Sequence, residues 1–277
     1  MESLKEKIIA DIRKTGFIKE LEVGSILRKN GWSTNHSDHY EDKDLSKSRE
    51  IDIIATKVKN DSENHLHLEF SLVIDVKKMN KKPWVIFSVD KDTSLTQGWR
   101  IQHSGYNYMR KYGDKKQYRA GIFSTEVDYK NFKKNVSKYG IAFHEAFKSP
   151  SETSKIYESL ISVCKATWHM NNRYDFGKLD DFDPEESTEL YIYIPLVVLD
   201  GYLYEAILNN NGEIELNEKE LIQIKLNYSS PNYGKSDIDF FPDIVHVNNL
   251  EEYLKRTDEW IEGMFEKFSL SIRKYRK

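Results

Sequence analysis

The chain has 277 residues and a net charge of −3, with 39% hydrophobic and 31% charged residues. This length allows a large buried core, and no apolar run approaches the roughly 20 residues that span a bilayer, so we expect no membrane segment. The single cysteine, Cys164, excludes an intrachain disulfide and a cysteine-rich zinc site, and a reducing, cytoplasmic location is the simplest expectation.

Two helices are predicted at the start of the chain. In residues 2–14, apolar side chains recur at helical spacing and share one face: Leu4, Ile8, Ile9 and Ile12. A second helix is predicted over residues 18–30, with Gly31 as its stop. Its inward stripe contains Val23 and Leu27, and Glu20 shares this stripe near the N-terminal end.

Two apolar strands that carry charged residues follow a predicted edge strand and loop at residues 33–48. Residues 49–54 predict a buried strand with Asp52, and residues 72–78 predict another with Asp75 and Lys77. Because side chains alternate along a strand, Asp75 and Lys77 should lie side by side on one face, while their apolar neighbours pack on the other.

The middle of the chain alternates between strand and helix patterns. Lys81-Lys82-Pro83 predicts a turn into a further buried strand. Helices are then expected at residues 96–112, 129–139 and 151–170, and strands at 84–88, 118–123 and 141–147. This order predicts an α/β protein with a mixed central sheet flanked by helices.

The last third is predicted to be a smaller, β-rich α+β unit. The acidic stretch at residues 175–189 indicates a linker or exposed loop, so we divide the chain into residues 1–174 and 175–277. Asp200-Gly201 is predicted to be a hairpin turn between two strands. Further elements are expected as a strand region at 213–228 and a helix at 250–273. This unit either packs on the first one or extends it, and its role is unknown.

The charged residues on the two strands suggest a metal site. Hard oxygen ligands hold Mg²⁺ or Mn²⁺ for phosphodiester cleavage. Asp52 and Asp75 would be metal ligands, and Glu20 would be a third carboxylate or hold a metal-bound water. Lys77 would orient or deprotonate the attacking water and stabilise developing charge. A costly structural ion pair is the alternative explanation for an acid and a base at this spacing.

Positive charge is concentrated after these strands. Residues 76–148 contain 16 Lys and Arg and only 6 Asp and Glu, so the remainder of the chain is acidic. Such asymmetry is typical of a surface that faces phosphate groups, although solvated helix faces give the same count. Lys78 and Lys81 are candidates for nucleic-acid contact or an outer shell of the site.

These residues resemble the signature of the PD-(D/E)XK nuclease superfamily, the restriction-endonuclease-like fold. Asp52 matches the acid of the first motif, and Asp75-Val76-Lys77 matches the second. The first motif lacks its proline, since Ile51 precedes Asp52, and the second has Asp in place of the commoner Glu. The resemblance covers roughly residues 15–148 and implies a helix followed by a strand meander, with Glu20 as the additional acid that many members carry.

One further motif fits a branch of that superfamily. Recombination exonucleases of this fold carry Gln-X-X-X-Tyr on the helix after the lysine strand, and Gln102 and Tyr106 have this spacing. On a helix the two would share one face, so Gln102 is an outer candidate. A polar helix surface with a buried tyrosine explains the same pair.

The sequence therefore predicts a Mg²⁺- or Mn²⁺-dependent nuclease, with a DNA endonuclease in microbial defence or restriction as its leading form. The alternatives are a non-catalytic nucleic-acid or protein binding module on the same fold, and an RNA-directed nuclease. No P-loop, Gly-X-Ser-X-Gly elbow or helical His-X-X-X-His pair supports another chemistry. A homodimer, and a partner protein bound through the C-terminal unit, are left open.

Overall fold

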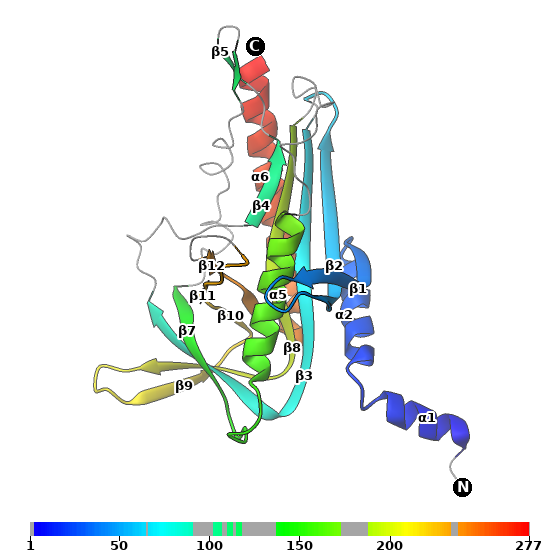
Figure 1. Ribbon diagram of the computed structural model, residues 1–277, viewed down its shortest axis with the longest axis vertical. Coiled ribbons are helices and arrows are strands. Elements are labelled where there is room, and N and C mark those ends of the chain that lie inside the picture. The colour runs from blue at the N-terminus through cyan, green and yellow to red at the C-terminus, as the bar shows by residue number, and fades with distance from the viewer. Residues whose placement is uncertain are drawn as a thin grey trace.

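Two long strands that run parallel form the centre of the computed structural model (Figure 1). The structure describes residues 3–64, 66–90, 102–106, 110–112, 115–117, 137–172, 188–233 and 238–276. Its helices are α1 (Leu4–Ile12), α2 (Phe17–Lys29), α5 (Lys155–Asn171) and α6 (Leu250–Arg276), with a 3₁₀ turn η3 (Val247–Asn249). Its strands are β1 (Ser33–Asp42), β2 (Lys47–Asp61), β3 (Leu66–Asp90), β4 (Gln102–Tyr106), β5 (Arg110–Tyr112), β6 (Lys115–Gln117), β7 (Lys138–Glu145), β8 (Thr188–Leu208), β9 (Ile214–Glu218), β10 (Leu221–Gln223), β11 (Leu226–Tyr228), β12 (Ile238–Phe240) and β13 (Asp243–His246).

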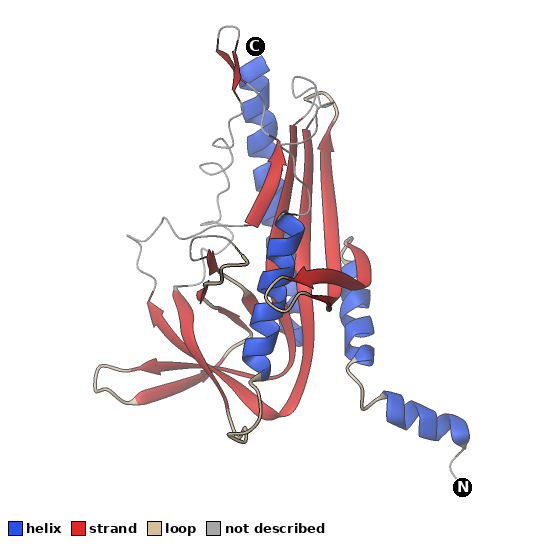
Figure 2. Cartoon of the chain, viewed as in Figure 1, coloured by secondary structure: helices blue, strands red, loops and turns tan. Residues whose placement is uncertain are grey.

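The main sheet is mixed and, within the described residues, contains nine strands. Strands β1, β2 and β3 form an antiparallel meander, and β3 pairs in parallel with β8 over most of its length. Short strands from the last third, β13 and β10, continue the sheet beyond β8. Figure 2 shows these strands with helices on both sides. The α/β class and the mixed sheet predicted from the sequence are confirmed.

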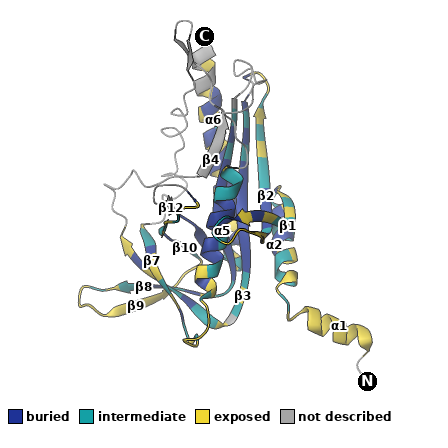
Figure 3. Cartoon of the chain, viewed as in Figure 1, coloured by how far each residue is buried: buried dark blue, intermediate teal, exposed yellow. Residues whose placement is uncertain are grey.

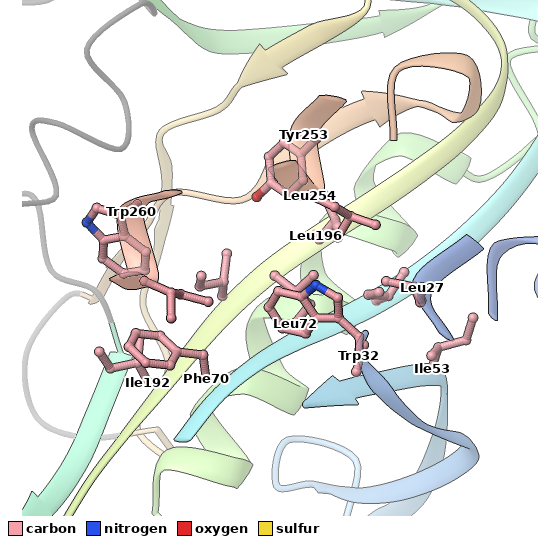
Figure 4. Close-up of a cluster of buried hydrophobic side chains, with 14 of the residues drawn as sticks. Leu27, Trp32, Ile53, Phe70, Leu72, Ile192, Leu196, Tyr253, Leu254 and Trp260 are labelled. Carbon is pink, nitrogen blue, oxygen red and sulfur yellow. The ribbon is translucent and has the colours of Figure 1, made fainter. Parts of the chain in front are cut away.

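Alternation along β3 separates two hydrophobic clusters, one on each face of the sheet. Leu72, Ile74 and Val76 join a cluster that includes residues of α2 and α6. Figure 4 shows how Leu27 of α2 and Trp260 of α6 lie over this face. Val73 instead belongs to a cluster formed with α5 on the opposite face. Both clusters are buried from solvent, as the dark central strands in Figure 3 show.

The strand β3 does not end at Lys81-Lys82-Pro83, and the turn predicted there is wrong. The strand continues for 25 residues, through Trp84 to Asp90. Its register against β8 changes between Met79 and Trp84. Over this interval β3 advances by five residues, whereas β8 advances by only two, from Gly201 to Leu203. Three extra residues therefore bulge from β3, and a bulge bends a strand without ending it.

The hairpin predicted at Asp200-Gly201 is also wrong, since both residues lie inside the continuous 21-residue strand β8. Gly201 pairs with Met79 of β3. A Cβ atom at Gly201 would lie 2.6 Å from the Met79 carbonyl oxygen, closer than such atoms can approach. The glycine is needed for this close approach of two strands.

The helix predicted at residues 96–112 is replaced by strands where the structure describes it. Residues 102–106 form β4, paired with β8, and residues 110–112 form β5, paired with β6. Backbone pairing with the long strand β8 overrides the local helical pattern. The strand predicted at 118–123 and most of the helix at 129–139 lie outside the described residues, although Lys138 and Tyr139 belong to β7.

Several predicted elements are confirmed. Helix α2 ends before Gly31, which has a φ of 77°, and α5 and α6 lie close to their predicted ranges. Cys164 is buried in α5 with a free thiol. The apolar residues of α1 are exposed, and no residue of that helix is buried (Figure 3).

The last third of the chain shares the sheet of the first part, because β8 and β13 extend it from β3. The acidic stretch that suggested a boundary lies mostly outside the described residues, and β8 begins at Thr188. Among the described helices, none has the length and apolar character needed to cross a membrane.

Candidate functional site

A gap in the pairing of β3 marks the site. Strand β2 pairs with β3 as far as Ile74, and β7 begins to pair with it at Trp84. Between these positions, within the described part of the chain, no strand covers residues 75–83 on the edge of β3 away from β8. Asp75, Lys77, Lys78 and Lys81 all lie in this open edge.

The predicted convergence of Asp52, Asp75 and Lys77 occurs at the start of the open edge. The Lys77 Nζ atom lies 2.8 Å from Asp75 Oδ1 and 4.0 Å from Asp52 Oδ2. These distances are within ion-pair range, so the three side chains form one charged group. The side chain of Asp75 is only 8% exposed and that of Lys77 is 27% exposed. The group is therefore half-buried and still open to solvent on one side.

Asp52 is held in place by the backbone of the neighbouring strand. The ladder between β2 and β3 ends at the pair Ile53 and Ile74, so Asp52 lies next to that end. Its Oδ2 atom accepts a hydrogen bond from the Val76 N–H at 2.7 Å. A strand end thus receives a side-chain acceptor where a partner strand would otherwise supply one.

Burial and the charge of neighbouring carboxylates raise the pKa of two acids near Lys77, Asp52 and Glu20. Burial, and then the charge of Asp75, raise the pKa of Asp52 to about 6. Burial and then the charge of Asp52 raise the pKa of Glu20 of α2 as well, so Glu20 is within electrostatic reach of the group. Burial alone would lower the pKa of Lys77, but the carboxylates of Asp75 and Asp52 raise it above its usual value. Lys77 is therefore a cation at neutral pH.

The donor set partly fits a divalent cation. The second carboxylate oxygen of Asp75, Oδ2, is buried and has no hydrogen-bond partner. Such an atom is costly unless something binds it. Within the described residues, however, no group of three His, Cys, Asp or Glu side chains is close enough together to hold a metal ion. Mg²⁺ commonly takes one or two protein carboxylates and completes its shell with water and substrate phosphate. Asp52 and Asp75 satisfy that smaller requirement.

The outer candidate Gln102 is not brought to this edge by the backbone. It lies on β4 and pairs with Tyr193 of β8, so β8 separates it from β3. The predicted shared helical face of Gln102 and Tyr106 is wrong, because both are in a strand.

Lys78 and Lys81 line a pocket of about 490 Å³ whose lining begins one residue beyond Lys77 on β3. We call it the lysine pocket. Its walls come from β3, β7 and the start of α5, and its lining consists of Lys78, Met79, Lys81, Lys82, Glu145, Glu152, Thr153 and Lys155.

Sequence patterns did not identify two basic members of the lysine pocket, Lys82 and Lys155. Lys82 could have been found from its place beside Lys81, but Lys155 gives no local signal because it is far away in the sequence. Lys77 also contributes to lowering the pKa of Glu158 in the first turn of α5, after the hydrogen bonds from Lys155 and Thr153. The first turn of α5 is therefore part of the surroundings of the site.

Comparisons of the chain with protein-family models, with curated proteins and with solved structures found no match.

Proposed function

We propose that the protein is a metal-dependent nuclease whose sheet is a restriction-endonuclease-like core. The observation that carries this proposal is the convergence of Asp52, Asp75 and Lys77 on the open edge of β3, with a buried and unpartnered oxygen on Asp75. We favour DNA as the substrate of this nuclease, and an endonuclease in microbial defence or restriction as its role.

Asp52 and Asp75 would hold Mg²⁺ or Mn²⁺, and Glu20 of α2 would act from outside the direct ligand set. When bound, the cation would neutralise charge on the phosphate and lower the pKa of water. Lys77 would act as a cation, because its raised pKa keeps it protonated at neutral pH. It would therefore orient the scissile phosphate and stabilise the charge that grows on it, rather than act as a base.

The lack of a third converging ligand favours one second candidate. Within the described residues no three-ligand metal group forms, and Lys77 occupies one oxygen of Asp75. The same arrangement suits a non-catalytic module that binds nucleic acid through its positive residues. The two candidates differ in whether phosphodiester bonds are broken.

Purified protein should be incubated with supercoiled, linear and single-stranded DNA and with RNA, in Mg²⁺, Mn²⁺ or EDTA. We expect metal-dependent cleavage that Asp75→Asn and Lys77→Met each reduce by roughly 100-fold or more. The first change removes a proposed metal ligand, and the second removes the cation that would stabilise charge on the phosphate. Lys255→Met and Glu251→Gln are matched controls, since both residues are exposed on α6, which packs on the other face of the sheet.

Cleavage by Asp75→Asn and Lys77→Met at the wild-type rate would contradict the nuclease proposal. Binding that persists in EDTA without cleavage in any metal supports the binding module, and cleavage of RNA alone assigns the substrate to RNA.

A further inference from the structure

The lysine pocket is built by the bulge in β3. The three extra residues between Met79 and Trp84 carry Lys81 and Lys82 out of the regular ladder. Lys78 follows Lys77 on β3 and pairs with Asp200 of β8 before the bulge, so the pocket begins one residue beyond the charged group in the chain. Bulges beside functional sites commonly re-aim side chains in this way.

The pocket has more positive than negative charge. Four lysines line it, against two glutamates. Lys82 is neutralised by an ion pair with Glu152, and Lys155 by one with Glu158. The carboxylate of Glu145 accepts the backbone N–H of Lys155 at 2.8 Å, so it caps the start of α5.

Lys78 and Lys81 are the two remaining lysines of the pocket. Both are exposed, and neither forms an ion pair within the described part of the chain. An unpaired lysine beside a concave surface is available to an external anion, and phosphate is the anion that a lysine binds as a point charge. Within the described residues no strand covers the edge of β3 that carries Lys77, Lys78 and Lys81.

We propose that the lysine pocket binds a backbone phosphate of the nucleic acid strand, next to the phosphate held by Lys77. The inference rests on the proposed function, since it names how the same site holds its substrate. Lys78 and Lys81 make the contact, and the ion pair between Lys82 and Glu152 supports the wall that presents them.

The test is equilibrium binding of labelled single-stranded DNA, duplex DNA and RNA, measured by fluorescence anisotropy in EDTA over a range of salt concentrations. The variants are Lys78→Gln, Lys81→Gln and the double variant, with Lys255→Gln on α6 as the matched control. We expect each pocket variant to weaken binding without regard to sequence and to reduce the slope of log affinity against log salt by about one. The control should keep the wild-type slope.

A second arm separates a backbone phosphate from a free one. Calorimetric titration with inorganic phosphate and with pyrophosphate should show weak or no binding to the wild type. Tight pyrophosphate binding that the double variant abolishes, with no change in the nucleic-acid slope, overturns the proposal in favour of a free anion. Pocket variants whose slopes equal that of Lys255→Gln also overturn it, as does a wild type that binds neither DNA nor RNA.

Because these measurements need no cleavage, the two proposals fail separately. A reduced slope in the pocket variants, in a protein that cuts nothing, retains the phosphate pocket and removes the nuclease. Cleavage by the wild type, with unchanged slopes in the pocket variants, retains the nuclease and removes the phosphate pocket.

Discussion

At the scale of single residues, the buried charge of Asp52 lowers the free energy of unfolding. Its carboxylate is partly buried beside Asp75, and burial and this neighbour raise its pKa to about 6, from an ordinary value of about 3.9. The folded state therefore binds a proton more readily than the unfolded chain does between these pH values. The free energy of unfolding must fall as pH rises through this window, and the full cost is present above it.

The substitution Asp52→Asn should stabilise the metal-free protein. Asparagine has no charge to bury, and its amide oxygen can still accept the Val76 N–H. In EDTA we expect the variant to be more stable than wild type by roughly 1–3 kcal/mol above pH 7, and equal to it below pH 4. Thermal or urea unfolding across this pH range measures the difference.

The matched control for Asp52→Asn is Asp11→Asn in α1, where no residue is buried. It should leave stability unchanged at every pH. Adding Mg²⁺ should stabilise wild type by mass action and leave Asp52→Asn unaffected, if Asp52 is a ligand. A variant less stable than wild type in EDTA at pH 7.5 would show that the charge of Asp52 is stabilising.

At the scale of elements, the two sequence patterns that wrongly predicted turns lie close together in the structure. Lys81-Lys82-Pro83 follows Met79 on β3, and Asp200-Gly201 lies on β8, where Gly201 pairs with Met79. Both patterns report one irregularity in a long parallel pair, a bulge on one strand and a close approach on the other. Parallel pairing joins segments more than 100 residues apart, so local sequence cannot reveal it.

Gly201→Ala should therefore destabilise the protein by about 1–3 kcal/mol, because the added methyl group would press on the Met79 carbonyl oxygen at 2.6 Å. Gly263→Ala in α6 is the matched control, since no atom lies within 4 Å of its added Cβ. This second change should stabilise the helix by about 0.5–1 kcal/mol. Opposite shifts in the melting temperature are expected, and a stable Gly201→Ala variant would argue against the close approach.

The part of the site that could be predicted from the sequence is the part formed by segments that are neighbours in the chain. The convergence of Asp52 with Asp75 and Lys77 could be expected because β2 and β3 are consecutive strands joined by a short turn. The lysine pocket could not, since it joins residues 78–82 to residues 145–155 and no periodic pattern links them. The helices α2, α5 and α6 were predictable from their apolar spacing, whereas β4 was not, since its pairing with β8 decides its form.

At the scale of the whole molecule, a buried ionic cluster ties distant parts of the chain together. Lys165 of α5 lies 2.8 Å from both Asp42 and Asp44, at the hairpin between β1 and β2. From the last third, Tyr228 donates a hydrogen bond to Asp44, and Tyr233 donates one to Asp42 at 3.4 Å. The hairpin that leads into the Asp52 strand is thus fixed to both α5 and the C-terminal part.

The charge of this cluster is well satisfied, which makes its loss costly. Asp42 is fully buried and the side chain of Lys165 is 7% exposed. Burial would raise the pKa of each carboxyl, but Lys165 holds the pKa of both Asp42 and Asp44 below its usual value. Since these folded-state values are depressed, the stabilisation is present above about pH 4 and is lost as pH falls below it.

Lys165→Met keeps most of the length of the side chain and removes its charge, which leaves Asp42 buried without its main partner. We expect it to reduce the free energy of unfolding by about 3–5 kcal/mol at pH 7, the range found when one member of a buried pair is removed. The deficit relative to wild type should shrink as pH falls below about 4, because protonated carboxyls no longer need the cation. Urea unfolding at several pH values measures both effects.

Lys59→Met is the matched control, since its ion pair with Glu262 is partly exposed and should contribute less than about 1 kcal/mol. Adding Asp42→Asn to Lys165→Met should recover part of the loss, because it removes the uncompensated charge. If instead Lys165→Met costs no more than Lys59→Met, and its deficit does not depend on pH, the cluster does not hold the hairpin to the rest of the molecule. In that case the position of Asp52 must depend on the β2 and β3 ladder alone.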